Sequence, residues 1–200
     1  MKRNPTQNKS HQKGAGKLRI IGGEWRSRQL PVVDLPGLRP TTDRVRETLF
    51  NWLQNDIPGA RCLDLFAGSG ALGFEAASRG AASVTMLELQ NNAAQVLSSN
   101  MQLLGASNVH LVKQDALSWL SSYDGETFDV VFIDPPFESD LMQRTIEVLE
   151  SCNCLAVNAS IYLETASNQF LPELPESWNL LKKKKAGQVS YYLARYDQES

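Results

Sequence analysis

Two short motifs contain the residues best suited to chemistry. The first, Gly68-Ser69-Gly70-Ala71-Leu72-Gly73, follows the apolar run Leu63–Phe66. Glycines at positions 68 and 70 let the backbone bend sharply and approach a ligand closely, and the helix expected next would point free N–H groups at that ligand. Such a turn binds an adenosine cofactor in dinucleotide enzymes and in S-adenosylmethionine (SAM) enzymes. A tight turn without a ligand is the alternative.

The second motif, Asp134-Pro135-Pro136-Phe137, follows the apolar run Val130–Ile133. Proline has no N–H, so backbone carbonyls here can face a substrate without a donor beside them. A carboxylate next to a carbonyl offers two acceptors to a substrate –NH₂ group, and Phe137 offers a face on which a planar base can stack. Acceptors that hold an aromatic amine favour its pyramidal form and direct its lone pair at an electrophilic methyl group. A rigid turn is the alternative interpretation.

Two further carboxylates follow expected strands. Glu88 comes twenty residues after Gly68, which is the spacing at which an acidic residue holds ribose hydroxyl groups. Asp115 could accept a hydrogen bond from an adenine amine, or it could cap the helix that follows it. If the strands are parallel, both carboxylates lie at the sheet edge that carries the glycine turn.

The chain alternates strand-like and helix-like runs. The expected strands are residues 61–66, 83–88, 109–112, 128–133 and 160–164. The expected helices are residues 71–79, 90–104, 115–121 and 139–150. This alternation predicts an α/β, Rossmann-like fold with a parallel sheet and helices on both faces. An antiparallel hairpin of residues 178–184 and 189–196, turning at 186–188, would make the sheet seven-stranded.

The N-terminal region differs from this pattern. Residues 1–16 are polar and basic, and we expect a disordered tail. Residues 17–40 predict a small β-hairpin that turns at Gly22-Gly23 and a proline-rich loop, both for RNA contact. The main α/β domain would then span residues 41–200, beginning with a helix capped by Thr41, Thr42 or Asp43.

Charge is divided unevenly along the chain. Residues 1–46 carry eleven Lys or Arg and three acidic residues, whereas residues 47–200 carry nine and nineteen. A basic arm on an acidic body is typical of a polyanion-binding attachment, and arginines interleaved with Trp25 suit RNA. A solvated tail is the alternative. Arg44 and Arg46 lie near a helix start, where the macrodipole disfavours cations, so each calls for a ligand or an acidic partner.

Other function classes find little support. No apolar stretch approaches the ~20 residues of a membrane span, and the N-terminus lacks the apolar core of a secretory signal. Cys62, Cys152 and Cys154 suit neither a disulfide framework nor a zinc site, and the two histidines are far apart. We therefore expect a cytoplasmic protein without a metal, with Cys62 in the core. Nothing suggests an obligate oligomer, so we expect a monomer.

Taken in order, these motifs resemble those of class I methyltransferases that act on exocyclic amines. The segments Leu18–Arg26 and Leu38–Asn51 resemble more narrowly the bacterial RsmD family, which methylates the N2 amine of one guanine in 16S rRNA. The resemblance covers about Lys17 to Tyr196. It implies SAM as cofactor and, as partner, 16S rRNA within a small ribosomal subunit or its assembly intermediate.

The resemblance also assigns residues. Glu88 would hold the ribose and Asp115 the adenine amine. The cofactor-binding residues would be Asp64, Phe66, Ala67, Gly68, Ser69, Gly70, Glu88, Asp115 and Ala116. The residues that orient and stack the guanine would be Asp134, Pro135, Pro136 and Phe137. The residues at the RNA would be Arg19, Arg26, Arg28, Arg39, Thr41 and Arg44. The chain departs from the family at Ser27, where glycine is common, and at Gln90, where an acidic residue is common.

Three alternatives stay open from the sequence. The Asp134–Phe137 motif alone would also serve methylation of an adenine or of a protein amide. A nicotinamide-dependent oxidoreductase could use the glycine turn, but it leaves Asp134–Phe137 unexplained. An RNA-binding or assembly protein that has lost catalysis is the third.

Overall fold

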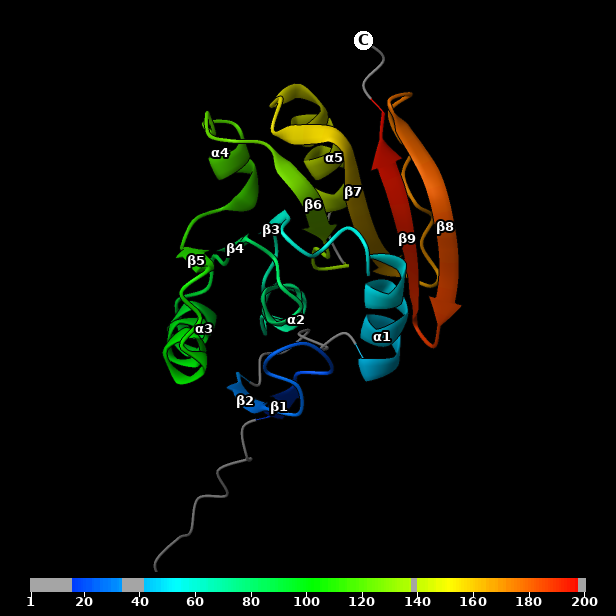
Figure 1. Cartoon of the computed structure of the whole chain (residues 1–200). Coiled ribbons are helices and arrows are strands. Elements are labelled where there is room, and N and C mark those ends of the chain that lie inside the picture. Colours follow the sequence, from blue (N-terminus) through cyan, green and yellow to red (C-terminus); the bar gives the residue numbers. More distant parts are fainter. Residues whose placement is uncertain (1–15, 34–41, 138–139, 198–200) are drawn as a thin grey trace, which may run out of the picture.

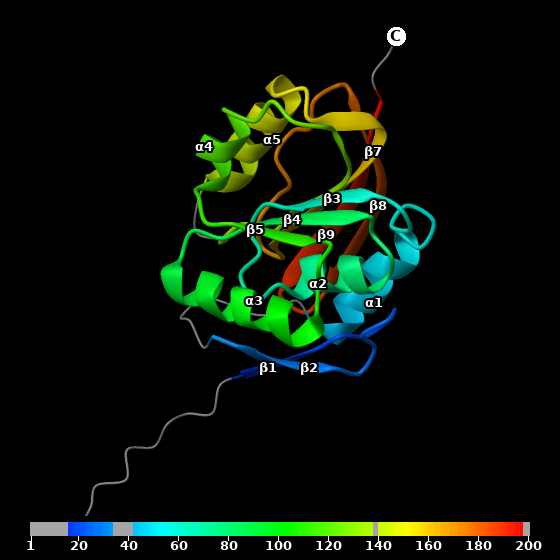
Figure 2. The same ribbon diagram turned by 60° about the vertical axis from the view of Figure 1, so that its left-hand side comes forward.

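The computed structural model of the protein describes residues 16–33, 42–137 and 140–197. Within these ranges the main body is one sheet with helices on both faces, and a small hairpin packs outside one helical layer (Figure 1, Figure 2). The tail up to residue 15, and the contacts predicted for Arg39 and Thr41, lie outside the described residues. Gly16, which we assigned to the tail, begins the first strand.

Seven strands form the main sheet in the spatial order β5-β4-β3-β6-β7-β9-β8. Their bounds are β3 Arg61–Asp64, β4 Ser83–Leu87, β5 Val109–Val112, β6 Phe128–Ile133, β7 Leu155–Ala166, β8 Trp178–Ala186 and β9 Val189–Tyr196. The strands β3 to β7 pair in parallel, and β9 pairs antiparallel with both β7 and β8. The predicted α/β fold with a mostly parallel seven-stranded sheet and a closing hairpin is confirmed.

Helices cover both faces of this sheet. Figures 1 and 2 show α1, α2 and α3 on one face and α4 and α5 on the other. Their bounds are α1 Asp43–Trp52, α2 Ala71–Ser78, α3 Asn91–Leu104, α4 Ala116–Leu120 and α5 Leu141–Ser151. Each helical layer encloses its own apolar core against the sheet. Of the three predicted caps for the first helix, Thr42 is the N-cap, since its side chain accepts from the Val45 amide.

The central strands β3 and β6 fix the position of the site. Both are buried along nearly their whole length, because helices cover both faces of a parallel sheet and leave room there for apolar side chains. Their register sets Asp64 beside Phe132. The turns that follow β3 and β6 therefore begin from neighbouring strand ends.

Strand β7 is longer than predicted, running over 155–166 instead of 160–164. Its first residues pair irregularly with β6, and Asn158 has a φ of +62°. Phe128 pairs with Leu155 but Val130 pairs with Ser160, so the register shifts by three residues and the alternation of apolar and polar positions is interrupted. The sequence pattern therefore revealed only the regular second half of the strand.

The N-terminal hairpin consists of β1, Gly16–Arg19, and β2, Gln29–Val32. The predicted hairpin is confirmed, but its connection is the whole segment 20–28 and not Gly22-Gly23 alone. That segment instead docks on the end of α2, where a Cβ at Gly23 would lie 1.8 Å from the Ser78 carbonyl oxygen. Ser27 has a φ of +68°, a conformation that glycine adopts more easily.

Glu75 of α2 joins this hairpin to the body. The side chain is fully buried, and it accepts hydrogen bonds of 2.8 Å from the amides of Ile21 and Gly22. It also forms ion pairs with Arg46 and Arg79 at 3.5 and 2.7 Å. A single buried carboxylate thus holds the hairpin, α1 and α2 together. Arg46 also pairs with Asp43 at 2.6 Å, so of the ligand and the acidic partner that the sequence left open, the structure shows acidic partners.

We expect Glu75→Gln to destabilise the protein by about 3 kcal/mol, because it removes the buried negative charge that pairs with both Arg46 and Arg79. Chemical denaturation measures this change in the free energy of unfolding. Glu24→Gln is the matched control, since Glu24 is exposed on the same hairpin connection and should change stability by less than about 0.5 kcal/mol. Equal stability of the two variants would contradict the role of Glu75.

Candidate functional site

The glycine turn between β3 and α2 is held by a buried carboxylate. Asp64 accepts a 3.0 Å hydrogen bond from the Gly73 amide and a second from the Phe66 amide. Gly68 and Gly70 have φ values of +51° and +77°, so the predicted need for glycine at both positions is confirmed. Burial raises the pKa of Asp64 to about 7, against the opposing effect of the two amides and with a further increase from Glu88.

Backbone hydrogen bonds bring four strand ends to one edge of the sheet. The Leu65 amide donates to the Phe132 carbonyl at 3.2 Å, and the Ala67 amide donates to the Leu87 carbonyl at 2.9 Å. The Glu88 amide donates to the Val112 carbonyl at 3.1 Å. Parallel strands place their carboxyl ends at the same edge, which is where ligands bind in open α/β sheets.

Glu88 lies at this edge and touches the glycine turn. Its carboxylate accepts from the Gly68 amide at 2.9 Å and from the Gln90 amide at 2.7 Å. Each carboxylate oxygen has two lone pairs, so these bonds leave capacity for ribose hydroxyl groups. The departure at Gln90 does not disturb this arrangement, because the backbone amide of Gln90 makes the contact.

Asp115 adopts the capping role that the sequence left open. Its Oδ1 accepts 2.9 Å hydrogen bonds from the amide and the hydroxyl of Ser118, and Ala116 opens α4 behind it. Capping does not consume the whole carboxylate, since both bonds go to one oxygen. The side chain is half-buried at the end of β5, so contact with an adenine amine stays a prediction.

The Asp134–Phe137 motif directly follows β6, beside the glycine turn. Asp134 and Phe137 are half-buried, Pro135 is buried and Pro136 is exposed. The Phe137 carbonyl accepts a 2.6 Å hydrogen bond from the Gln169 side chain, which fixes the end of the motif. The structure thus brings the motif and the glycine turn to adjacent strands, as predicted.

Sequence reasoning missed two buried groups beside Asp134. Tyr162 donates a 2.5 Å hydrogen bond to Glu164, and both side chains are almost fully buried in β7. Burial raises the pKa of Tyr162 well above its ordinary value, and the charges of Glu164 and Asp134 raise it further. The only available signal was the position of Glu164 at the end of an apolar strand.

The predicted RNA-contacting residues divide into two groups. Arg19 pairs with Asp43 at 2.9 Å, and Arg28 donates to the Leu103 carbonyl near the end of α3. Both side chains therefore also contact the protein body. Arg26 and Arg44 are exposed. RNA contact by any of them stays a prediction.

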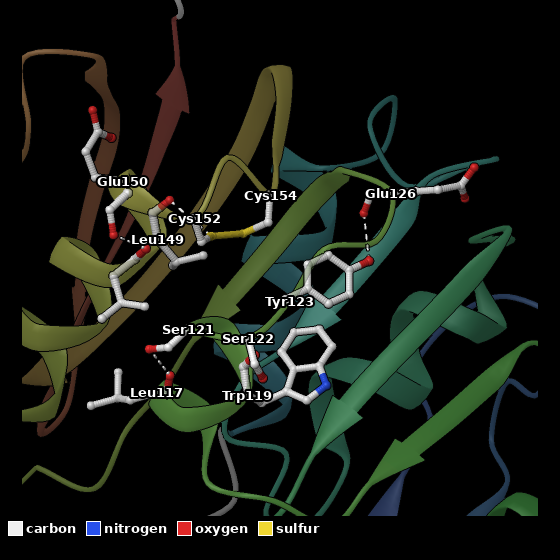
Figure 3. The surroundings of a disulfide bond; sticks show 12 residues. Leu117, Trp119, Ser121, Ser122, Tyr123, Glu126, Leu149, Glu150, Cys152 and Cys154 are labelled. Carbon is white, nitrogen blue, oxygen red and sulfur yellow. Dashed lines mark hydrogen bonds between the residues drawn. A yellow bond between two sulfur atoms is a disulfide. The ribbon is translucent and has the colours of Figure 1, made fainter.

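A disulfide joins Cys152 and Cys154 between the end of α5 and the start of β7 (Figure 3). The sequence predicted that the three cysteines form no disulfide framework, and it did not predict this single bond. The left-handed turn at Asn153, with a φ of +52°, brings the two Cα atoms to 5.3 Å, within the range that a disulfide needs. Cys62 is buried in the core as predicted, and burial raises its thiol pKa.

Residues 16–33, 42–137 and 140–197 contain neither a candidate metal site nor a candidate membrane-spanning helix. No three His, Cys, Asp or Glu side chains there form a group that could hold a metal ion. None of the helices in these ranges has the length and apolar character of a membrane span.

Comparison with known proteins agrees with this geometry. The family model described as Conserved hypothetical protein 95 matches residues 18–195. Ribosomal RNA small subunit methyltransferase D of Escherichia coli K12 is 51% identical over 185 residues, which cover 92% of this chain and 93% of that protein. The Haemophilus influenzae protein of the same name is 50% identical over 181 residues, 89% of this chain and 93% of that protein.

A solved structure with the name methyltransferase yhhF, from Escherichia coli, superposes on this chain with a TM-score of 0.85 and 49% identity. The match covers 92% of this chain and 100% of that one. Sheet order, glycine turn and strand-end carboxylates together define a Rossmann-like methyltransferase fold. Within that class, the chain belongs to the RsmD family, and the resemblance seen in its sequence is confirmed.

The raised pKa of Asp64 predicts a pH-dependent stability. The folded protein holds this proton more tightly than the unfolded chain, in which the pKa of Asp is about 3.9. Stability from this group is therefore fully present below about pH 4 and is lost as the pH rises through about 7. From pH 5 to pH 8 the unfolding free energy of the wild type should therefore decrease. In Asp64→Asn this decrease should be smaller by about 2 kcal/mol, because asparagine does not titrate. Denaturation curves at both pH values measure this, and parallel pH profiles would contradict it.

Proposed function

We propose that this protein transfers a methyl group from SAM to the exocyclic N2 amine of a guanine in 16S rRNA. The observation that carries the proposal is the placement of the glycine turn and the Asp134–Phe137 motif at the ends of adjacent strands, β3 and β6. One motif suits the cofactor and the other an aromatic amine, and a transfer reaction needs both at one place.

The residues at the sheet edge fit SAM. The turn at Gly68 and Gly70 would hold its methionine part, with the Phe66, Ala67 and Ser69 backbone around it. Glu88 would hold the ribose, and Asp115 the adenine amine. The almost fully buried Glu88 makes this edge acidic, and an acidic site attracts the positive sulfonium. When bound, SAM supplies a methyl group already activated by that charge.

The substrate side of the site is built to orient an amine. The Asp134 carboxylate and the Pro135 carbonyl accept hydrogen bonds from the two N–H groups of the target amine, and Phe137 stacks on the base. Acceptors at both hydrogens favour a pyramidal nitrogen whose lone pair is free to attack. The amine proton that is released on methylation leaves along the hydrogen bond to the Asp134 carboxylate or to water.

The names of the relatives support rRNA of the small subunit as substrate, and the family resemblance supports guanine N2. A base inside a helix cannot present its amine to this edge, so the target guanine would be flipped out at a cost of a few kcal/mol. We also propose the assembled subunit or its assembly intermediate as the form of the substrate.

We expect Asp134→Ala to lower the rate of methyl transfer at least about 100-fold, because it removes an interaction that orients the reacting amine. Asp134→Asn keeps one acceptor oxygen and should lie between Ala and wild type. Affinity for SAM should be unchanged in both. Asp140→Ala, six residues further on and exposed, is the matched control. Wild-type rates for Asp134→Ala, measured with labelled SAM, would refute the role of Asp134.

The target base is tested by product analysis. Small subunits that lack the modification are incubated with the protein and SAM, and the methylated nucleoside is identified by mass spectrometry. We expect N2-methylguanosine, with no product from Asp134→Ala. Methylated adenosine or a methylated protein amide would contradict guanine as the substrate while leaving the methyltransferase assignment in place.

A further inference from the structure

One edge of the main sheet carries a run of four lysines. Lys182, Lys183, Lys184 and Lys185 lie on β8 and all four are exposed. Among the described residues, β8 has a neighbouring strand on one side only. They are four of the nine Lys and Arg residues in residues 47–200, which also contain nineteen acidic residues. Concentrated positive charge on an acidic body indicates a polyanionic partner.

Strand register places this lysine run near the carboxyl ends of the parallel strands, where the candidate site lies. Across β7 and β9, Ile133 at the end of β6 is level with Lys183 of β8. Asp134 is the next residue after Ile133, so it is level with Lys184. Three strand spacings separate β6 from β8, which corresponds to about 14 Å. The lysine run thus borders the site on its β8 side, and Figure 1 shows β7 and β9 between β6 and β8.

Aromatic rings support the lysine side chains on both faces of the strand. The Lys182 Nζ lies 5.6 Å from the centroid of the Trp52 ring, and the Lys183 Nζ lies 5.4 Å from that of the Tyr192 ring. Successive strand residues point to opposite faces. Each ring face attracts the ammonium group that lies over it, which helps to keep these two exposed charges in place.

The lysine run differs from the four arginines of the same segment. Arg61, Arg79, Arg144 and Arg195 each form an ion pair with a carboxylate. In the part of the chain that the structure describes, no carboxylate lies within ion-pair distance of the four lysines. Their charge is not neutralised by these residues and is available to a ligand.

We propose that Lys182–Lys185 bind backbone phosphates of the substrate RNA next to the target base. The proposal rests on the proposed function, because it takes the anion to be rRNA. A lysine ammonium is a point charge that binds phosphate without reading sequence. The lysine run therefore holds the strand on one side of the site while Asp134 and Phe137 receive the base.

Lysines on an edge strand also discourage pairing between the sheets of two molecules. That role predicts aggregation when the lysines are neutralised, without a change in RNA affinity. The two roles are therefore separable by measuring binding on the monomeric fraction.

The test compares the wild type with variants in which all four lysines become Gln or all become Arg. Binding to small subunits that contain unmodified 16S rRNA is measured over a series of salt concentrations, together with SAM affinity and steady-state kinetics. For the Gln variant we expect RNA affinity to fall at least about 10-fold and the log–log salt slope to become shallower by about 2 to 3. KM for RNA should rise, whereas SAM affinity and kcat should not change. The Arg variant should bind like the wild type.

A single-charge control separates this site from a general charge effect. Lys184→Gln is compared with Arg61→Gln, because Arg61 begins β3 at the opposite edge of the sheet. Only Lys184→Gln should reduce the salt slope, by about 1. Unchanged RNA affinity and slope in the fourfold Gln variant would overturn the proposal, and light scattering would then show whether the lysines only prevent edge pairing. If the wild type binds RNA through the lysines but transfers no methyl group, the proposed function fails and the phosphate site stands.

Discussion

The hydrogen bond from the Gly73 amide to the buried Asp64 carboxylate constrains the whole site. It ties the first turn of α2 to the end of β3, so the glycine turn between them has one course. Glu88 holds the same turn from the next strand by accepting the Gly68 amide. The cofactor loop is therefore positioned by strand ends, and the same sheet register sets the Asp134 motif beside it. Loops held in this way can be short and still keep a defined geometry.

The sequence predicted the parts of the fold that depend on local pattern. Strands β3 and β6 were located within two residues, because a strand buried on both faces leaves an apolar run in the sequence. The connection 20–28 was not predicted, since Glu75 and Ser78, more than fifty residues away, determine its course. The same holds for the disulfide, which depends on a left-handed turn at Asn153 that an asparagine permits but does not require.

The candidate site shows the same division. Residues in motifs with characteristic spacing, such as Gly68, Glu88 and Asp134, could be found from the sequence. Asp115 had two possible roles, and only coordinates show that it caps α4. The pair of Tyr162 and Glu164 belongs to no motif, because its meaning comes from the register between β6 and β7. Contacts that depend on the pairing of two strands cannot be predicted from the sequence of either strand alone.

The position of strand β9 affects how the sheet is completed during synthesis. It lies between β7 and β8 although it follows both in the chain, so during synthesis β8 emerges from the ribosome before its only neighbour exists. Until residues 189–196 are made, β7 and β8 both lack the strand that pairs with them in the folded sheet. Their unpaired backbone groups could then pair with other chains. Four consecutive positive charges on β8 disfavour such pairing during that interval. The same lysines can therefore limit aggregation of the nascent chain and, in the folded protein, bind RNA phosphates as proposed.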